Sequence, residues 1–111
     1  NAKRLNADEV RKEANDWDFS EEGRKRQSFR MKTLADFEKQ NGRKVICDFI
    51  CPTAEARKIF NADYSIWMDT IKESEYKDTD KIFERPSNIN LKISKWDQYS
   101  PSEIADLIRN V

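Results

Sequence analysis

The stretch VICDFICPT, residues 45–53, decides the fold class of this 111-residue chain. Residues 45–50 are apolar except for Asp48, and such a run predicts a parallel strand that is covered on both faces. A helix is predicted to follow at once, from Pro52 to Phe60. A buried strand that leads directly into a helix is the repeating unit of α/β folds, so we expect the same alternation along the rest of the chain.

The remaining sequence continues this alternation. It predicts strands at Ala2–Leu5, Tyr64–Met68 and Leu91–Ile93, helices at Asp8–Asn15, Ser20–Gln40 and Ile71–Tyr76, and a polar loop at Asp78–Asn90. The order predicts an α/β fold with a mainly parallel sheet flanked by helices, in a single domain of residues 1–111.

The last helix has the clearest local signal. Residues 100–103 read Ser-Pro-Ser-Glu, which is a capping box with Pro at the first helical position. Ile104, Leu107, Ile108 and Val111 follow at helical spacing. We therefore expect an amphipathic helix that packs on a core.

The charge balance excludes a general attraction to polyanions. Lys and Arg total 21, as do Asp and Glu, so the net charge is zero. Nucleic acid and anionic membranes are therefore not favoured as partners, and an anion site must be a local cluster of Arg or Lys. No apolar run approaches the roughly 20 residues that span a bilayer, so no membrane partner is expected.

The absence of His and the scarcity of Cys exclude several kinds of site. Cys–His and Ser–His–Asp catalysis both need an imidazole, and a zinc site needs more ligands than Cys47 and Cys51 supply. Four residues of strand would separate these two Cα atoms by about 13 Å, beyond disulfide reach. Reduced thiols indicate an intracellular, cytoplasmic protein.

Polar residues follow the predicted strands, where α/β sheets bind their ligands. Asp8 could orient Mg²⁺ or accept a hydroxyl proton, and Arg11 could bind an anion on the same helical face. The simpler alternative is a helix N-terminus that favours Asp. Ile50 and Cys51 end another strand, and the simpler alternative there is an ordinary Pro turn.

The start of the long helix gathers a second set of polar side chains. Arg24, Gln27 and Arg30 recur at three-residue spacing and share a face, with Phe19 just before them. An aromatic ring, two guanidinium groups and an amide could hold a nucleotide base and its phosphate. A solvated basic face is the alternative.

Five segments resemble, in order, the motifs of one kinase family. Residues 6–11 (NADEVR), 18–20 (DFS, followed by Arg24 and Gln27), 48–52 (DFICP), 68–69 (MD) and 80–86 (DKIFERP) are similar to its Asp-Gly-Asp-Asn-x-Arg, Gly-Phe-Ser, Ser-Phe-Ile-Ser-Pro, Val-Asp and Asp-Ser-Pro-Tyr-Glu-x-Pro segments. The family is adenylylsulfate kinase, which phosphorylates the 3′-hydroxyl of adenylylsulfate with MgATP.

The resemblance implies a nucleotide-binding transferase of sulfate assimilation with the three-layer P-loop kinase fold, a small nucleotide substrate, MgATP as cofactor and a homodimer. Asp8 would be the general base or the Mg²⁺-linked acid. Arg11, Phe19, Arg24 and Gln27 would hold the nucleotide, together with Ile50 and Cys51.

The sequence departs from the family at several of these positions. Asn6 stands for the first Asp of the family, Asp18 for a Gly, Gly23 for an Asp and Gln27 for an Asn, while Asp48 and Cys51 stand for two serines. Only residues 70–79 occupy the interval of the basic lid.

The Gly-x-x-Gly-x-Gly-Lys-Ser/Thr loop, which binds ATP phosphates in this family, does not occur in the sequence. We therefore expect a sheet that lacks the first strand and the P-loop helix, about 30 further residues upstream in the natural protein, and poor phosphate transfer by these 111 residues alone. Two alternatives stay open: a related kinase for nucleotides or polynucleotide ends, and a non-catalytic nucleotide-binding module.

Overall fold

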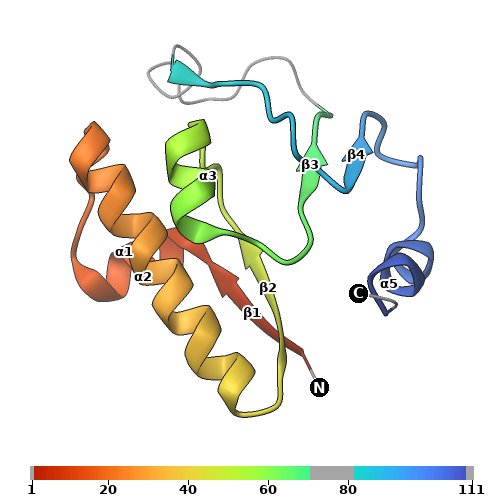
Figure 1. The fold of residues 1–111 in the computed structure, drawn as a ribbon, viewed down its shortest axis with the longest axis horizontal. Helices are drawn as coiled ribbons and strands as arrows, with labels where there is room; N and C mark the ends of the chain where they lie inside the picture. Colours follow the sequence, from red (N-terminus) through yellow and green to blue (C-terminus); the bar gives the residue numbers. More distant parts are fainter. Residues whose placement is uncertain (1, 71–81, 110–111) are drawn as a thin grey trace. The chain divides into compact units, whose positions relative to one another are not determined.

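The computed structural model describes residues 2–70 and 82–109 (Figure 1). The chain divides into two compact units, Asn1–Asn61 and Ala62–Val111, and each is considered by itself. The expected helix at 71–76 and the first part of the expected loop lie outside the described residues. The single-domain organisation expected from the sequence stays a prediction.

The first unit is a parallel strand pair with three helices. Its elements are β1 (Ala2–Asn6), α1 (Ala7–Ala14), α2 (Glu21–Gln40), β2 (Lys44–Asp48) and α3 (Ala54–Phe60). The two strands pair in parallel from Ala2 opposite Lys44 to Asn6 opposite Asp48 (Figure 1). Both strands therefore end at the same edge, and each leads from that edge toward a helix.

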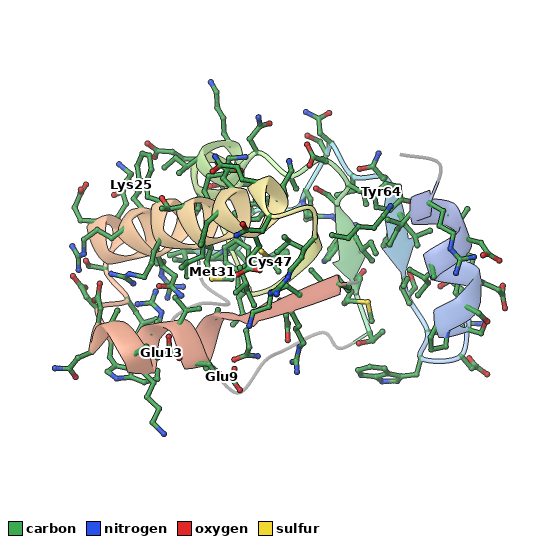
Figure 2. All side chains as sticks on the ribbon, turned by 90° about the horizontal axis from the view of Figure 1, so that it is seen from below. Glu9, Glu13, Lys25, Met31, Cys47 and Tyr64 are labelled. Carbon is green, nitrogen blue, oxygen red and sulfur yellow. The ribbon has the colours of Figure 1, made fainter. Side chains whose placement is uncertain are left out.

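The core of the first unit lies between α2 and the strand pair. Met31 is fully buried there and clusters with Leu5, Val10 and Ala35, while Cys47 packs against the cluster (Figure 2). These apolar residues come from β1, β2, α1 and α2, so burial of the cluster holds these four elements together.

Side-chain caps set the helix starts in the first unit. Asn6 Oδ1 accepts from the backbone N–H groups of Asp8 and Glu9, Ser20 Oγ from Gly23, and Thr53 Oγ1 from Ala56. These bonds satisfy N–H groups that have no partner within the helix. Asn15 and Asn61 end α1 and α3 in the left-handed conformation, which Asn tolerates better than most residues.

The second unit contains another parallel strand pair and one described helix: β3 (Ile66–Met68), β4 (Leu91–Ile93) and α5 (Pro101–Arg109). The capping box is confirmed, because Ser100 Oγ accepts from the Glu103 N–H at 3.2 Å and Glu103 Oε1 accepts from the Ser100 N–H at 3.3 Å. The expected packing of this helix on a core is only partial in its described residues: none is buried, but Ile104, Ala105 and Ile108 are partly covered. Two three-residue strands offer little surface to cover it.

The predicted parallel α/β fold is confirmed, but the strand at residues 45–50 needs correction. It ends at Asp48, and its burial alternates instead of being continuous, with Ile46 56% exposed. The reason is that α2 covers only one face of a two-stranded sheet. The described residues contain two such two-stranded sheets, one in each unit.

Within residues 2–70 and 82–109, no helix combines the length and apolar character needed to cross a membrane.

Candidate functional site

The connection between α1 and α2 carries the most distinctive arrangement in the first unit. Phe19 lies in this connection with its ring 48% exposed, directly before the Ser20 cap. Two guanidinium groups lie close to the ring: the Cζ atom of Arg11 is 4.4 Å from its centroid and that of Arg24 is 5.5 Å away. A half-exposed aromatic ring close to two cations is a surface that suits a planar, anionic molecule.

Arg11 contacts the ring from α1 and is itself buried, with 5% exposure. Its Nη1 atom donates to the backbone oxygens of Asp16 at 2.9 Å and Asp18 at 3.2 Å. Burial lowers the pKa of Arg11, although a guanidinium stays charged at neutral pH. The residue therefore fixes the loop that carries Phe19.

Arg24 reaches the same ring from the first turns of α2. Its Nε atom donates to the Phe19 backbone oxygen at 2.8 Å. This bond fixes the Arg24 guanidinium group beside the backbone of Phe19. Compared with Arg11, Arg24 lies nearer the surface.

Gln27 occupies the next turn of α2 and is 3% exposed. Its Nε2 atom donates to the Ala7 backbone oxygen at 3.0 Å, and its Oε1 atom accepts from Arg30 Nη1 at 2.5 Å. The structure therefore brings Gln27 to the site but gives its amide partners within the protein. The predicted shared face of Gln27 and Arg30 is confirmed by their bond.

Asp8 lies in the first exposed turn of α1, beyond the end of β1. It is one turn before Arg11, and the Gln27 bond holds the residue that precedes it. At the same edge, Asn6 Nδ2 donates to Asp48 Oδ2 at 3.2 Å, and Arg4 donates to the same oxygen at 2.8 Å. The ends of both strands thus present carboxylates, of which that of Asp48 is held by protein donors.

Ile50 and Cys51 form the turn between β2 and α3. The Ile50 side chain is half exposed, and Cys51 has a positive φ of 45°, which is uncommon for a residue with a side chain. Arg57 donates to the Cys51 and Pro52 oxygens at 3.0 Å each, and this pair of bonds holds the turn.

Neither cysteine is activated as a nucleophile. The Cys51 Sγ atom lies 3.9 Å from Ser28 Oγ on α2, next to Gln27. Burial raises the pKa of Cys51, and it raises that of Cys47 to about 11. Both thiols are therefore protonated at neutral pH, and both are free, as expected from their spacing.

Sequence reasoning missed an ionic cluster beside this site. Asp16 and Asp18 accept from two arginines of α2, Arg26 and Arg30, at 2.7–3.3 Å. The bonds from Arg26 and Arg30 hold the pKa of Asp16 well below its usual range, and those from Ser20 and Arg26 lower that of Asp18 to about 2. The sequence indicated only that the helix predicted at Asp8–Asn15 ends here.

Among the described residues, the exposed Asp8 carboxylate is a candidate ligand for a magnesium ion. No group of three or more potential metal ligands occurs among the described residues. This fits Mg²⁺, which is commonly held by one or two carboxylates together with water and substrate phosphates. The residues do not fit the ATP phosphates themselves, because the sequence contains no glycine-rich phosphate-binding loop.

The structure thus brings the sequence-predicted residues of the first unit into one region. Arg11 and Arg24 meet at Phe19, Gln27 joins them to the start of α1, and Cys51 contacts the neighbouring Ser28. They lie at the carboxyl ends of β1 and β2, on α1 and α2 or, for Phe19, in the connection between these two helices.

Known structures share this fold. The chain is similar to an APS kinase CysC of Mycobacterium tuberculosis solved as a cysteine-to-alanine variant, with a TM-score of 0.69 and 24% identity over 98% of this chain and 73% of that one. It is also similar to the same kinase solved in complex with AMPPNP and APS, with a TM-score of 0.71 and 19% identity over 96% of this chain and 77% of that one.

A comparison with curated proteins found no match. The family model for adenylylsulphate kinase matches residues 1–92, which include the whole strand pair, the Phe19 site and β3. This match extends over most of the chain and agrees with the shared fold. The chain belongs to the adenylylsulphate kinase family.

Proposed function

We propose that the first unit binds adenylylsulfate as the acceptor of an ATP-dependent phosphotransfer to its 3′-hydroxyl. The observation that carries the proposal is the half-exposed Phe19 side chain with the guanidinium groups of Arg11 and Arg24 close to its ring. Adenylylsulfate combines a planar base with a negatively charged phosphosulfate, and these are the two features that such a surface recognises.

Each side chain has a distinct part in this proposal. Phe19 stacks on the adenine, since aromatic faces bind bases without needing a particular hydrogen-bond pattern. Arg24 binds the phosphosulfate, because the guanidinium fork matches the oxygens of such groups. Arg11 is buried and donates to the backbone oxygens of Asp16 and Asp18, so it fixes the loop that carries the Phe19 ring. Ile50 and Cys51 border the base from the turn after β2.

Asp8 is the residue that we assign to the chemistry. Its carboxylate is exposed at the end of β1, one turn from Arg11. A carboxylate in that position can accept the proton of the attacking hydroxyl or contribute a ligand to Mg²⁺. When bound, MgATP supplies the phosphoryl group and the metal charge.

Phosphate transfer requires a P-loop, which the 111 residues do not contain. We therefore assign acceptor binding to these residues and transfer to a protein in which such a loop completes the site. The free thiols fit the cytoplasm, which we propose as the location.

Calorimetric titration of the chain with adenylylsulfate tests this proposal. Saturable binding is expected, with weaker binding of adenosine monophosphate, which lacks the sulfate. An oligonucleotide with a free 5′-hydroxyl tests the polynucleotide alternative, and tighter binding of that probe would replace adenylylsulfate as the acceptor. Binding without transfer in the P-loop-containing protein would favour a non-catalytic module.

Arg24→Ala is expected to weaken adenylylsulfate binding by about 10–100-fold, since hydrogen bonds to charged groups contribute roughly 1.5–3 kcal/mol. Arg43→Ala is the control, because Arg43 follows the far end of α2 and pairs only with Glu38 among the contacts described for it. The affinity of the Arg43→Ala variant for adenylylsulfate should equal that of the wild type. Equal affinity of the Arg24 variant would remove Arg24 from the binding site.

A further inference from the structure

The loop that carries Phe19 is held by arginines from two helices. From α2, Arg30 donates to the Asp16 carboxylate at 2.7 Å, and Arg26 donates to the same group at 3.2 and 3.3 Å. From α1, Arg11 donates to the Asp16 backbone oxygen at 2.9 Å. The Asp16 side chain is 15% exposed, so this cluster is partly withdrawn from water.

Arg30 extends these contacts toward Asp8. Its Nη2 atom binds Asp16, and its Nη1 atom binds Gln27, whose amide in turn donates to the Ala7 backbone oxygen. Ala7 is the residue directly before Asp8. A continuous path of hydrogen bonds therefore runs from the Phe19 loop, through α2, to the start of α1.

The path depends on the shape of the Arg30 side chain. One planar guanidinium group presents separate N–H groups to the Gln27 amide and the Asp16 carboxylate. A lysine ammonium is a single point charge on a flexible stem and does not reproduce this fork. An arginine needed only for its charge would tolerate lysine, whereas one needed for its two directions would not.

We propose that Asp16 and Arg30 are positioning residues that fix the distance and orientation between Asp8 and Phe19. Neither residue contacts the acceptor in this assignment; they act through Gln27 and the Phe19 loop. The inference rests on the proposed function, in which Asp8 and Phe19 address opposite parts of one nucleotide. Small displacements of such groups reduce rates and affinities strongly.

Arg30→Lys and Asp16→Asn test the proposal, with Glu38→Gln as the control. In Asp16→Asn, an amide NH₂ would face the arginine donors. Glu38→Gln instead weakens the ion pair between Glu38 and Arg43, which lies at the C-terminal end of α2. Three properties of each folded variant are measured. The first is the affinity for adenylylsulfate, and the second is the amide hydrogen exchange of residues 7–9 and 17–20. The third is acrylamide quenching of Trp17, excited at 295 nm, with the signal of the Trp17→Phe protein subtracted.

Both variants are expected to bind adenylylsulfate about tenfold more weakly or worse. Hydrogen exchange should accelerate at residues 7–9 and at residues 17–20 together, while α3 and the Glu38→Gln control remain unchanged. Trp17 should become more accessible to the quencher. A purely structural role would instead change the unfolding midpoint and leave the affinity of the folded protein unaltered.

Unchanged exchange at residues 7–9 in Arg30→Lys would overturn the proposal, since the path would then end at the loop. Failure of the wild type to bind adenylylsulfate is a different result, because it contradicts the proposed function. The exchange measurement decides the positioning role in either case: joint acceleration of both segments supports it and independent behaviour refutes it.

Discussion

Asp8→Asn is expected to lower the turnover of ATP-dependent transfer to adenylylsulfate about 10²–10⁴-fold in the P-loop-containing protein, the range for loss of a general base. The amide has nearly the same shape as the carboxylate but cannot accept the hydroxyl proton, and it is a poorer ligand for Mg²⁺. Because the Asp8 side chain is exposed, the fold should be retained. Initial rates with saturating MgATP and adenylylsulfate measure the effect.

Glu9→Gln is the matched control for this prediction. Glu9 occupies the same first turn of α1, and Figure 2 shows its side chain pointing away from α2. Both substitutions remove one negative charge near the helix N-terminus, so their small effects on helix stability should be similar. Turnover within a factor of two between the variants would show that Asp8 has no chemical role.

Gly23→Ala is expected to destabilise the protein by about 3 kcal/mol, the upper end of the usual range for an overpacked site. A Cβ atom at Gly23 would lie 2.1 Å from the Asp18 backbone oxygen and 2.7 Å from its carbonyl carbon. The Asp18 backbone oxygen accepts from Arg11 Nη1 at 3.2 Å, and backbone atoms cannot move away as a flexible side chain would. Urea unfolding followed by circular dichroism measures the loss.

Gly42→Ala is the corresponding control, because nothing lies within 4 Å of a Cβ atom there. Gly42 has a φ of +79°, so alanine at that position should cost only about 1–2 kcal/mol of backbone strain. Gly23 is helical, where alanine would otherwise be favoured by about 1 kcal/mol. If Gly23→Ala lowered the stability less than Gly42→Ala does, that result would contradict the close approach of Asp18 to Gly23 on α2.

This close approach explains two departures from the family pattern at once. Where the family has Gly before Phe-Ser and Asp three residues after the Ser, this chain has Asp18 and Gly23. The Asp18 carboxylate carbon would lie 2.6 Å from a Cβ atom at Gly23, so the two acidic positions compete for one space. Asn6 and Asp48 show a second exchange of this kind, with the carboxylate on the neighbouring strand.

Local signals allowed most of the fold to be predicted from the sequence. The Ser20 cap, the Asn15 turn and the capping box at residues 100–103 each act through hydrogen bonds between near neighbours, so the sequence alone contains them. The parallel pairing followed from the alternation of strands and helices. The extent of β2 did not, because the coverage of a strand depends on elements far away in the sequence.

The sequence predicted which residues of α2 lie together at the site, but not which of them are buried. The spacing brought Arg24, Gln27 and Arg30 to one face of α2, and the structure keeps them there. Which of these side chains is buried depends on contacts of Gln27 with Ala7, twenty residues away. Long-range polar pairing of this kind has no short-range signature, and for that reason the sequence did not predict the contacts of Asp16 with Arg26 and Arg30.

The two-stranded sheets have a practical consequence for handling the protein. In the described residues every strand has one edge without a neighbour, and β2 adds the exposed apolar side chain of Ile46. Unpaired strand edges recruit strands from other molecules and start aggregation, which flanking charges oppose. Lys44 places a charge at the start of β2 beside this edge, and keeping the protein dilute should limit such association.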